Sequence, residues 1–473
     1  VHYCSSVCMY RIAPCASRSR WYCTSSLPAP ARDIRLTGRT GHGTPHLQHR
    51  LATCTSLCEV LELIGQSDPA RWSPISLATA WHRLARYARG PGDMSKRLHK
   101  GVRKAKRRLA NAHRRRLTSH GSFHDFQARQ AANILYAWGK LRFQKDDLLQ
   151  ELCARVACTH DDLTAQGVAN SLYALGLLDF KHEQLLGVLC ARAGHSLEDF
   201  SEQGISNMIY SLGVLHFRHD RLLDAACCHI PGRLHEFSAQ GLSNTAYGLG
   251  LLGFKHAGFL YALCAMLQGN LTQLSQQQIS NTTYALGLLR FKHVKFLSAV
   301  CQQVPTRLKQ FKPQGVSNIV YALGLLDFEN EYFLASVCSH MLTHLDEFNA
   351  QGVSNIIYSL GCLRYRHELL LQVVCKDMTN RLEHFNAQDI SNVVYALGLL
   401  QFQDKELWRA FQIHLPCRLS EFRAQSLAVL AVALSLLHSD FPTLRARTIV
   451  QFHVLKAGKK NKMTRRASEL KKK

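Results

Sequence analysis

An asparagine and a tyrosine three residues apart recur eight times in this sequence, each time within nearly the same run of residues. Both side chains can contact nucleic acid, because an amide can hydrogen-bond a base edge and a phenol ring can stack on an unpaired base. The same pair can instead join neighbouring structural units, with the tyrosine packed in a core. The eight pairs are Asn133 and Tyr136, Asn170 and Tyr173, Asn207 and Tyr210, Asn244 and Tyr247, Asn281 and Tyr284, Asn318 and Tyr321, Asn355 and Tyr358, and Asn392 and Tyr395.

A position that varies between the copies lies six residues after each tyrosine. The constant pair cannot distinguish one nucleotide from another, so a protein that reads bases needs a variable residue in each repeat. If one base is read per repeat, this variable column is a candidate site, and the alternative interpretation is a solvated turn. The column comprises Arg142, Asp179, His216, Gly253, Arg290, Asp327, Arg364 and Gln401.

Two residues beyond the variable column, most copies carry a lysine or an arginine. A line of cations suits phosphate groups, but cations near a helix C-terminus also interact favourably with that helix's own carbonyl groups. The members of this basic line are Lys181, Arg218, Lys255, Lys292 and Arg366. A histidine follows each of them, too far from the next histidine in sequence to suggest a shared metal ion. These histidines are His182, His219, His256, His293 and His367.

The elements that must position these columns follow from the spacing, which is 37 residues between equivalent positions in all eight copies. A fixed period of this size predicts a solenoid, whose units bury their apolar faces by stacking on one another. In the copy at 237–274, Ser238 is placed as a helix N-cap, apolar residues then follow at helical spacing, GFKH ends this helix, and a second apolar run follows. We therefore predict an all-α fold, an α-solenoid of about eight 37-residue helix-turn-helix repeats, with a ninth degenerate unit at 422–437 and basic, partly disordered flanks.

Two small residue types keep the same period. A glycine costs up to about 1 kcal/mol in a helix interior, so we expect the neighbouring helix to approach closely at each one. These glycines are Gly139, Gly176, Gly213, Gly250, Gly287, Gly324, Gly361 and Gly398.

Cysteines in apolar runs predict buried, reduced thiols rather than metal or redox chemistry, and hence a reducing compartment. They are Cys153, Cys190, Cys227, Cys264, Cys301, Cys338 and Cys375.

The formal charge of +25 lies in the flanks. Residues 1–120 carry 22 Lys+Arg against 5 Asp+Glu, and residues 442–473 carry 11 against 1, which leaves 25 against 27 in the array. The first fifty residues hold seven arginines, no lysine and one acid, a composition typical of an organelle transit peptide. The expected domains are a transit-peptide-like or disordered leader at 1–56, a degenerate helical pair plus a basic helix at 57–120, the repeat array at 121–441, and a basic tail at 442–473.

The segment 94–116 carries eleven Lys+Arg and no acid, with apolar residues at helical spacing. It is therefore predicted to be a basic amphipathic helix. Such helices contact RNA phosphates, dock on anionic lipid or serve in nuclear import, and we favour these uses in that order. The candidate phosphate-binding residues are Lys104, Arg107, Arg108, Arg114, Arg115 and Arg116. No stretch approaches the roughly 18 consecutive apolar residues of a membrane helix, so no integral membrane segment is expected.

The repeated unit FxAQGxSNxxYALGLLxF, together with ISLATAWHRLAR at 75–86, resembles the octotricopeptide and heptatricopeptide repeat proteins. These are relatives of the FAST-kinase-like and RAP-domain proteins. The resemblance covers residues 57–440, and the strict period is closer to the heptatricopeptide type. It implies a nucleus-encoded RNA binder of a mitochondrion or chloroplast, with the nucleus less favoured. Its expected partners are single-stranded RNA and ribonucleoprotein components, and its expected role is RNA processing, stability or translation. No RAP-like module follows Leu437, so a nuclease role lacks support.

No arrangement of residues suggests catalysis. The sequence has no phosphate-binding glycine loop, no HExxH motif and no carboxylate pair outside the repeat phase. We therefore predict no enzyme activity, no catalytic or metal-binding residues and no cofactor. Two functions remain open: an organellar RNA-binding solenoid, and a protein-binding helical scaffold whose array does not contact RNA, which the near-neutral array favours.

Overall fold

A computed structural model of the chain describes residues 44–88, 95–120, 123–436 and 445–454. The chain divides into two compact units, Val1–Phe126 and Gln127–Lys473, which we call the N-terminal unit and the array unit. The expected leader up to residue 43 and the basic tail from residue 455 lie outside the described residues. Within them, no helix is both long and apolar enough to span a membrane.

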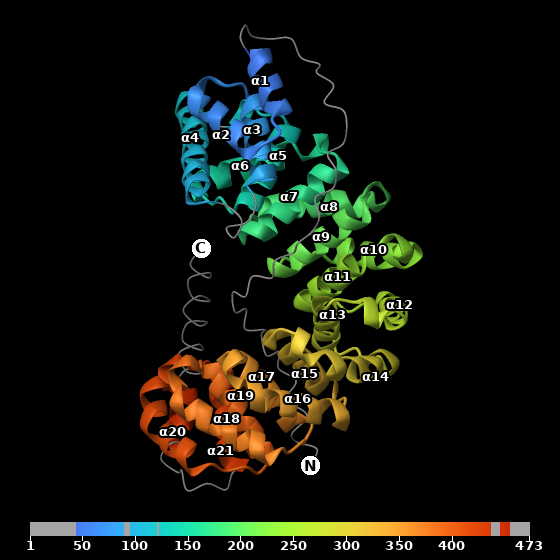
Figure 1. Cartoon of the computed structure of the whole chain (residues 1–473), viewed down its shortest axis with the longest axis vertical. Helices are drawn as coiled ribbons and strands as arrows, with labels where there is room; N and C mark the ends of the chain where they lie inside the picture. Colours follow the sequence, from blue (N-terminus) through green and yellow to red (C-terminus); the bar gives the residue numbers. More distant parts are fainter. Residues whose placement is uncertain (1–43, 89–94, 121–122, 437–444, 455–473) are drawn as a thin grey trace, which may run out of the picture. The chain divides into compact units, whose positions relative to one another are not determined.

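The N-terminal unit is helical (Figure 1). Its elements are α1 (Thr44–Thr53), α2 (Leu57–Gln66), the 3₁₀ turn η2 (Pro69–Arg71), α3 (Pro74–Tyr87), α4 (Lys96–His120) and η3 (Phe123–Asp125). Helices α2 and α3 lie where the helical pair is expected, and α4 lies where the basic helix is expected. The segment expected as a leader at 1–56 includes α1, which packs against α3. Arg83 donates a hydrogen bond to the carbonyl of Ala52, and the Tyr87 hydroxyl donates one to the carbonyl of Cys54 at 2.8 Å.

The array unit confirms the predicted α-solenoid of paired helices (Figure 1). Each first helix packs on the first helix of the next repeat, and each second helix packs on the next second helix, so two layers form. The first helices are α5 (Ala128–Leu141), α7 (Ala165–Leu178), α9 (Glu202–Val214), α11 (Ala239–Leu252), α13 (Gln276–Leu288), α15 (Pro313–Leu326), α17 (Ala350–Cys362), α19 (Ala387–Leu399) and α21 (Ala424–Leu436). The second helices are α6 (Asp146–Cys158), α8 (Glu183–His195), α10 (Asp220–His229), α12 (Ala257–Gln268), α14 (Val294–Gln303), α16 (Glu331–His344), α18 (Glu368–Asn380) and α20 (Lys405–Arg418). The described part of the chain contains no strand.

The first helices begin at the polar residues that the sequence indicates. The side chain of Ser238 accepts a hydrogen bond from the backbone N–H of Gly241 at 3.1 Å, and Pro313 stands in the first turn of α15. A 3₁₀ turn joins each repeat to the next, a feature that the sequence analysis did not predict. In η5 (Leu197–Asp199) the turn buries Leu197 and Phe200, so the repeat boundary also contributes to the core. Residues 445–454 form a further helix, in a segment predicted only as a basic tail.

The repeated cysteines and glycines occupy the expected places in the core. All seven cysteines are fully buried and reduced, and burial raises the pKa of thiols such as Cys153 and Cys301 to about 12, so they remain protonated. The glycines face the neighbouring first helix at backbone distance. A Cβ atom built on Gly213 would lie 2.6 Å from the Cα of Gly248. The prediction of close helix approach is therefore confirmed.

The buried carboxyl group of Asp389 predicts a pH-dependent stability. Asp389 is 3% exposed, and burial raises its pKa from 3.8 to about 6, although the backbone N–H of Asn386 donates a hydrogen bond to it. Folding therefore favours the protonated form. The stability that protonated Asp389 contributes is fully present below about pH 4. It is lost as the pH rises through about 6, which lowers the free energy of unfolding by up to about 3 kcal/mol.

We expect Asp389→Asn to abolish this loss, because an amide oxygen can accept the same hydrogen bond without titrating. The measurement is the free energy of unfolding by denaturant at a series of pH values. If the free energy of unfolding depended on pH in the same way for the wild type and Asp389→Asn, the raised pKa of Asp389 would be contradicted.

Candidate nucleic-acid interface

The repeated tyrosines form a continuous stack along the array. Neighbouring rings from Tyr210 through Tyr395 have centroids 6.0–6.2 Å apart, with interplanar angles of 29–39°. A ring inside this row has a tyrosine on either side along the array and is buried or half-buried, which leaves little of its surface for a base. Burial raises the pKa of Tyr321 to about 12, which keeps its phenol protonated. This geometry favours the structural interpretation of the tyrosines over base stacking.

The asparagines lie beside the tyrosine stack and are buried or half-buried. Asn281 is only 2% exposed, and the Nε2 group of Gln388 donates a hydrogen bond to Oδ1 of Asn392 at 3.2 Å within α19. In two repeats the serine that precedes the asparagine bonds to the following repeat. The hydroxyl of Ser354 donates to the carbonyl of Asp389, and that of Ser391 to the carbonyl of Ser426, both at 3.1 Å. These two serines, which the sequence analysis overlooked, therefore join neighbouring repeats near the end of the array.

The variable column occupies a special backbone position. All eight residues have a left-handed φ, between 48° and 62°, and all eight are exposed. In the repeat of α13, the backbone N–H of Arg290 bonds to the carbonyl of Gly287 at 3.1 Å and that of Phe291 to the carbonyl of Leu286 at 3.0 Å. These two bonds form the Schellman motif that ends many helices. The turn fixes the backbone and requires no particular side chain, so the column is free to vary. Two of its side chains are bonded inside the array, because Arg290 donates a hydrogen bond to the carbonyl of Leu325 and Gln401 Nε2 donates one to the carbonyl of Gly398 at 2.9 Å.

The basic line lies against the variable column of the next repeat, and we call the two together the loop edge. Lys255 donates a hydrogen bond to the carbonyl of Arg290 at 3.0 Å, and Lys292 donates one to that of Asp327 at 2.6 Å. The Lys255 ammonium also lies 5.7 Å from the ring centre of Phe291. The cation thus satisfies a helix C-terminus of the following repeat. The predicted phosphate role therefore competes with a bond inside the array.

Lys292→Ala is expected to lower the free energy of unfolding by about 1 kcal/mol, because it removes a hydrogen bond and a cation–ring contact between repeats. The matched control is Lys295→Ala, which removes an exposed cation three residues further along. Denaturant midpoints measure the difference. Equal midpoints for the two variants would show that the inter-repeat contact of Lys292 contributes no stability.

The histidines that follow the basic line are N-caps of the second helices. In each, Nδ1 accepts a hydrogen bond from a backbone N–H three residues on, as for His293 and Phe296 at 3.2 Å. Asn330 and Asp404 take this place in two repeats and make the same bond. Asn and Asp are both favoured N-cap residues. Their presence at this position in two repeats could therefore have indicated the capping role from the sequence.

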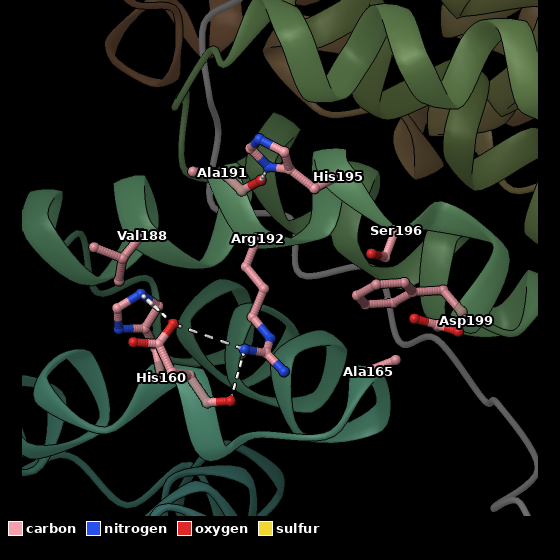
Figure 2. Close-up of a pocket in the computed structure, with 10 residues that line it drawn as sticks. His160, Ala165, Val188, Ala191, Arg192, His195, Ser196 and Asp199 are labelled. Carbon is pink, nitrogen blue, oxygen red and sulfur yellow. Dashed lines mark hydrogen bonds and ion pairs between the residues drawn. The ribbon is translucent and has the colours of Figure 1, made fainter.

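Arginines at or just after the C-terminal ends of several second helices bond their repeat to the one before. Arg192 on α8 donates hydrogen bonds to the carbonyls of Asp161 and Leu163, at 2.8 and 2.5 Å. Arg307 and Arg418 reach back in the same way. Figure 2 shows Arg192 beside His160 in an open pocket between α8 and the preceding turn. Its charged groups pair with one another, since Asp161 lies within 3.3 Å of His160 and 3.9 Å of Arg192. This pocket is therefore a structural junction.

Helix α4 separates its apolar and cationic residues within the N-terminal unit. Val102, Ala105, Leu109 and Ala112 are at most 6% exposed and face α2, α3 and η2. Docking on lipid uses the apolar face of an amphipathic helix, and here that face is buried in the protein's own core. The opposite face is cationic and exposed. Its residues are Lys96, Arg97, Lys100, Arg103, Lys104, Arg107, Arg114 and Arg115, which we call the α4 cationic face.

The candidate phosphate-binding residues of α4 have different surroundings. Lys104 and Arg107 are exposed. Arg108 is half-buried and donates a hydrogen bond to the carbonyl of Ser67 at 2.6 Å, so it serves the fold. Arg115 pairs with Asp68 at 3.6 Å, with both side chains largely exposed. The side chain of Arg116 lies outside the described residues. Sequence reasoning omitted Lys100 and Arg103, which share the exposed face and could have been found from its helical spacing.

Comparison with known proteins relates this geometry to a family. A family model described as RNA-editing substrate-binding complex 6 protein matches residues 96–323 and 306–406. The chain belongs to this family. The region matched to the RNA-editing substrate-binding complex 6 protein family begins at α4 and runs into α20, so it contains both the α4 cationic face and the loop edge. A search of curated proteins found no match to the chain. The family supports an RNA-associated helical-repeat protein, whereas the narrower octotricopeptide, heptatricopeptide and FAST-kinase-like resemblances stay predictions.

Proposed function

We propose that this protein is an RNA-binding subunit of an RNA-processing complex, which holds single-stranded RNA rather than transforming it. The observation that carries the proposal is the α4 cationic face, which presents eight exposed cations on a helix without any acid. Because its apolar seam is buried, α4 offers charge alone to a partner, and a polyanion is the partner that charge alone attracts. Membership of a family named for an RNA-editing substrate-binding complex supports RNA as that polyanion.

In this proposal the α4 cationic face binds phosphates and the variable column of the loop edge contacts bases. From Lys96 to Arg107 the cations recur at least once per helical turn, a rise of about 5.4 Å, and Arg114 and Arg115 follow about two turns later. They form a row for phosphates that binds without regard to sequence. The exposed residues of the variable column differ in charge and hydrogen-bonding groups from repeat to repeat. Their side chains are therefore the array's candidates for base contacts, with Arg364 able to make paired hydrogen bonds to a base edge.

We further propose that the protein acts in a mitochondrion or a chloroplast. The support is the arginine-rich, acid-poor composition of the first fifty residues and the resemblance to organellar repeat proteins. RNA processing, RNA stability and translation are the steps that such an RNA-holding subunit can serve. Fluorescence imaging of the full chain with a C-terminal tag tests the location, and a purely cytosolic or nuclear signal would refute it.

The decisive test of RNA binding is its salt dependence. We expect fluorescence anisotropy to show binding of the full chain to labelled single-stranded RNA, with the logarithm of affinity falling by about 0.7 for each phosphate contact per decade of salt. The control is a duplex RNA of the same length, which is expected to bind less tightly because its bases are not exposed. Absence of binding at low salt, or an affinity independent of salt, would refute the proposal.

A protein-binding scaffold is the second candidate function. The observation that favours it is that the basic line is bonded within the array, which has a small net negative charge. The variants Asp327→Gly and Arg364→Gly separate the two functions, because Gly253 shows that this backbone position accepts glycine. If the array reads RNA, these variants alter the preference among RNA sequences. If they alter only the proteins recovered with the chain, the array is a scaffold.

A further inference from the structure

Three side chains of different chemical type converge at the boundary between two repeats. Asp224, Cys228 and His256 place one oxygen, one sulfur and one nitrogen atom within 4.8 Å of one another. Asp224 and Cys228 stand four residues apart on α10, so both project from the same face of that helix. His256 comes from the next repeat, as the N-cap of α12, and its Nε2 lies 3.7 Å from Cys228 Sγ.

The chemistry of this set is that of a transition-metal site. A thiolate, an imidazole and a carboxylate are zinc ligands, and the thiolate disfavours Mg²⁺ and Ca²⁺. Three protein ligands leave a fourth position of a tetrahedral ion for water. Asp224 and Cys228 are exposed and His256 is half-buried, so an ion from solvent can reach all three.

We propose that Asp224, Cys228 and His256 bind Zn²⁺ and thereby join α10 to α12. Binding releases the Cys228 thiol proton, because the thiolate is the ligand. Binding also changes which ring nitrogen of His256 carries the proton. Nδ1 of His256 now accepts a hydrogen bond from the backbone N–H of Phe259 at 3.1 Å, so in the neutral ring Nε2 carries the proton. Ligation through Nε2 moves that proton to Nδ1, and the ion therefore binds at the expense of one helix-cap hydrogen bond.

The repeats themselves provide substitutions that preserve the fold. Ala191 and Ala265 stand where Cys228 does, and Ala335 stands where Asp224 does. Asn330 stands where His256 does and accepts the capping hydrogen bond from Phe333 at 2.9 Å. Cys228→Ala, Asp224→Ala and His256→Asn therefore remove the ligands one at a time without removing the helix cap.

The test titrates the reduced, metal-free full chain with Co²⁺ and then displaces it with Zn²⁺. We expect a sulfur-to-cobalt charge-transfer band and one more bound equivalent for the wild type than for each of the three ligand variants. The matched controls are His293→Asn, which changes an equivalent cap, and Cys417→Ala, which removes another exposed thiol. Both are expected to bind as the wild type does. No charge-transfer band, or equal binding by wild type and Cys228→Ala, or an equal loss in the controls, would overturn the proposal.

Discussion

Replacing Lys100, Arg103, Lys104 and Arg107 together by glutamine is expected to weaken binding of single-stranded RNA by at least about tenfold at low salt, a loss of about 1.4 kcal/mol or more. All four side chains belong to the α4 cationic face and are exposed, so their removal leaves the buried seam of the helix intact. If each contacts one phosphate, the slope of log affinity against log salt also falls by about 3, since each contact contributes about 0.7.

The matched control changes four exposed cations of the array to glutamine, namely Lys309, Lys376, Lys405 and Arg409. It alters the net charge by the same amount, so a common electrostatic effect would weaken both proteins equally. We expect the control to retain most of its RNA affinity and nearly its full salt slope, as measured by fluorescence anisotropy. Equal losses in the two proteins would show that α4 is not a specific phosphate-binding surface. Circular dichroism verifies that α4 remains folded in the variant.

Gly213→Ala is expected to destabilise the array by about 3 kcal/mol or more, although alanine is the better helix former. The added methyl group would lie 2.6 Å from the Cα and 2.8 Å from the carbonyl oxygen of Gly248. Both are backbone atoms, so no side chain can rotate out of the way, and α9 and α11 must move apart. Because each repeat is stabilised by its neighbours, we expect denaturation to occur in two steps, with the repeats on either side of this contact unfolding separately.

Gly187→Ala provides the opposite expectation within the same array. A methyl group on Gly187, which lies in α8, meets no atom within 4 Å. This variant is expected to gain about 0.5–1 kcal/mol from the higher helix propensity of alanine. Denaturant unfolding followed by circular dichroism measures both changes. If Gly213→Ala were as stable as Gly187→Ala, the helices would not be held at backbone contact.

The sequence predicted the local features of each repeat because their causes lie within a few residues. Ser238 and Pro313 mark helix starts through bonds or geometry in the first turn, and the buried cysteines follow from apolar neighbours on the same helix face. Because the same pattern recurs eight times, helix bounds that are ambiguous in one copy can be read from the others. The repeat length and the helix pairs could therefore be derived without tertiary information.

The candidate sites were only partly predictable, since their partners come from other elements. Lys255 was assigned to phosphate from its charge, and its bond to the carbonyl of Arg290 could not be foreseen from local sequence. The same holds for Arg108, which reaches Ser67, and for His256, whose position beside Cys228 depends on how two repeats stack. Residue type indicated what these groups can bind, but not which partner they already have.

The sequence by itself determined an all-α array of 37-residue helix pairs, with a variable position six residues after each repeated tyrosine and with its excess cations in the flanks. These properties depend on residue order and helical periodicity alone. The tertiary structure decided that the tyrosines cover one another, that the basic line is bonded between repeats, and that the apolar seam of α4 is buried. The physical reason is that exposure and pairing depend on the rotation and separation of neighbouring helices, which side-chain packing across the whole fold sets.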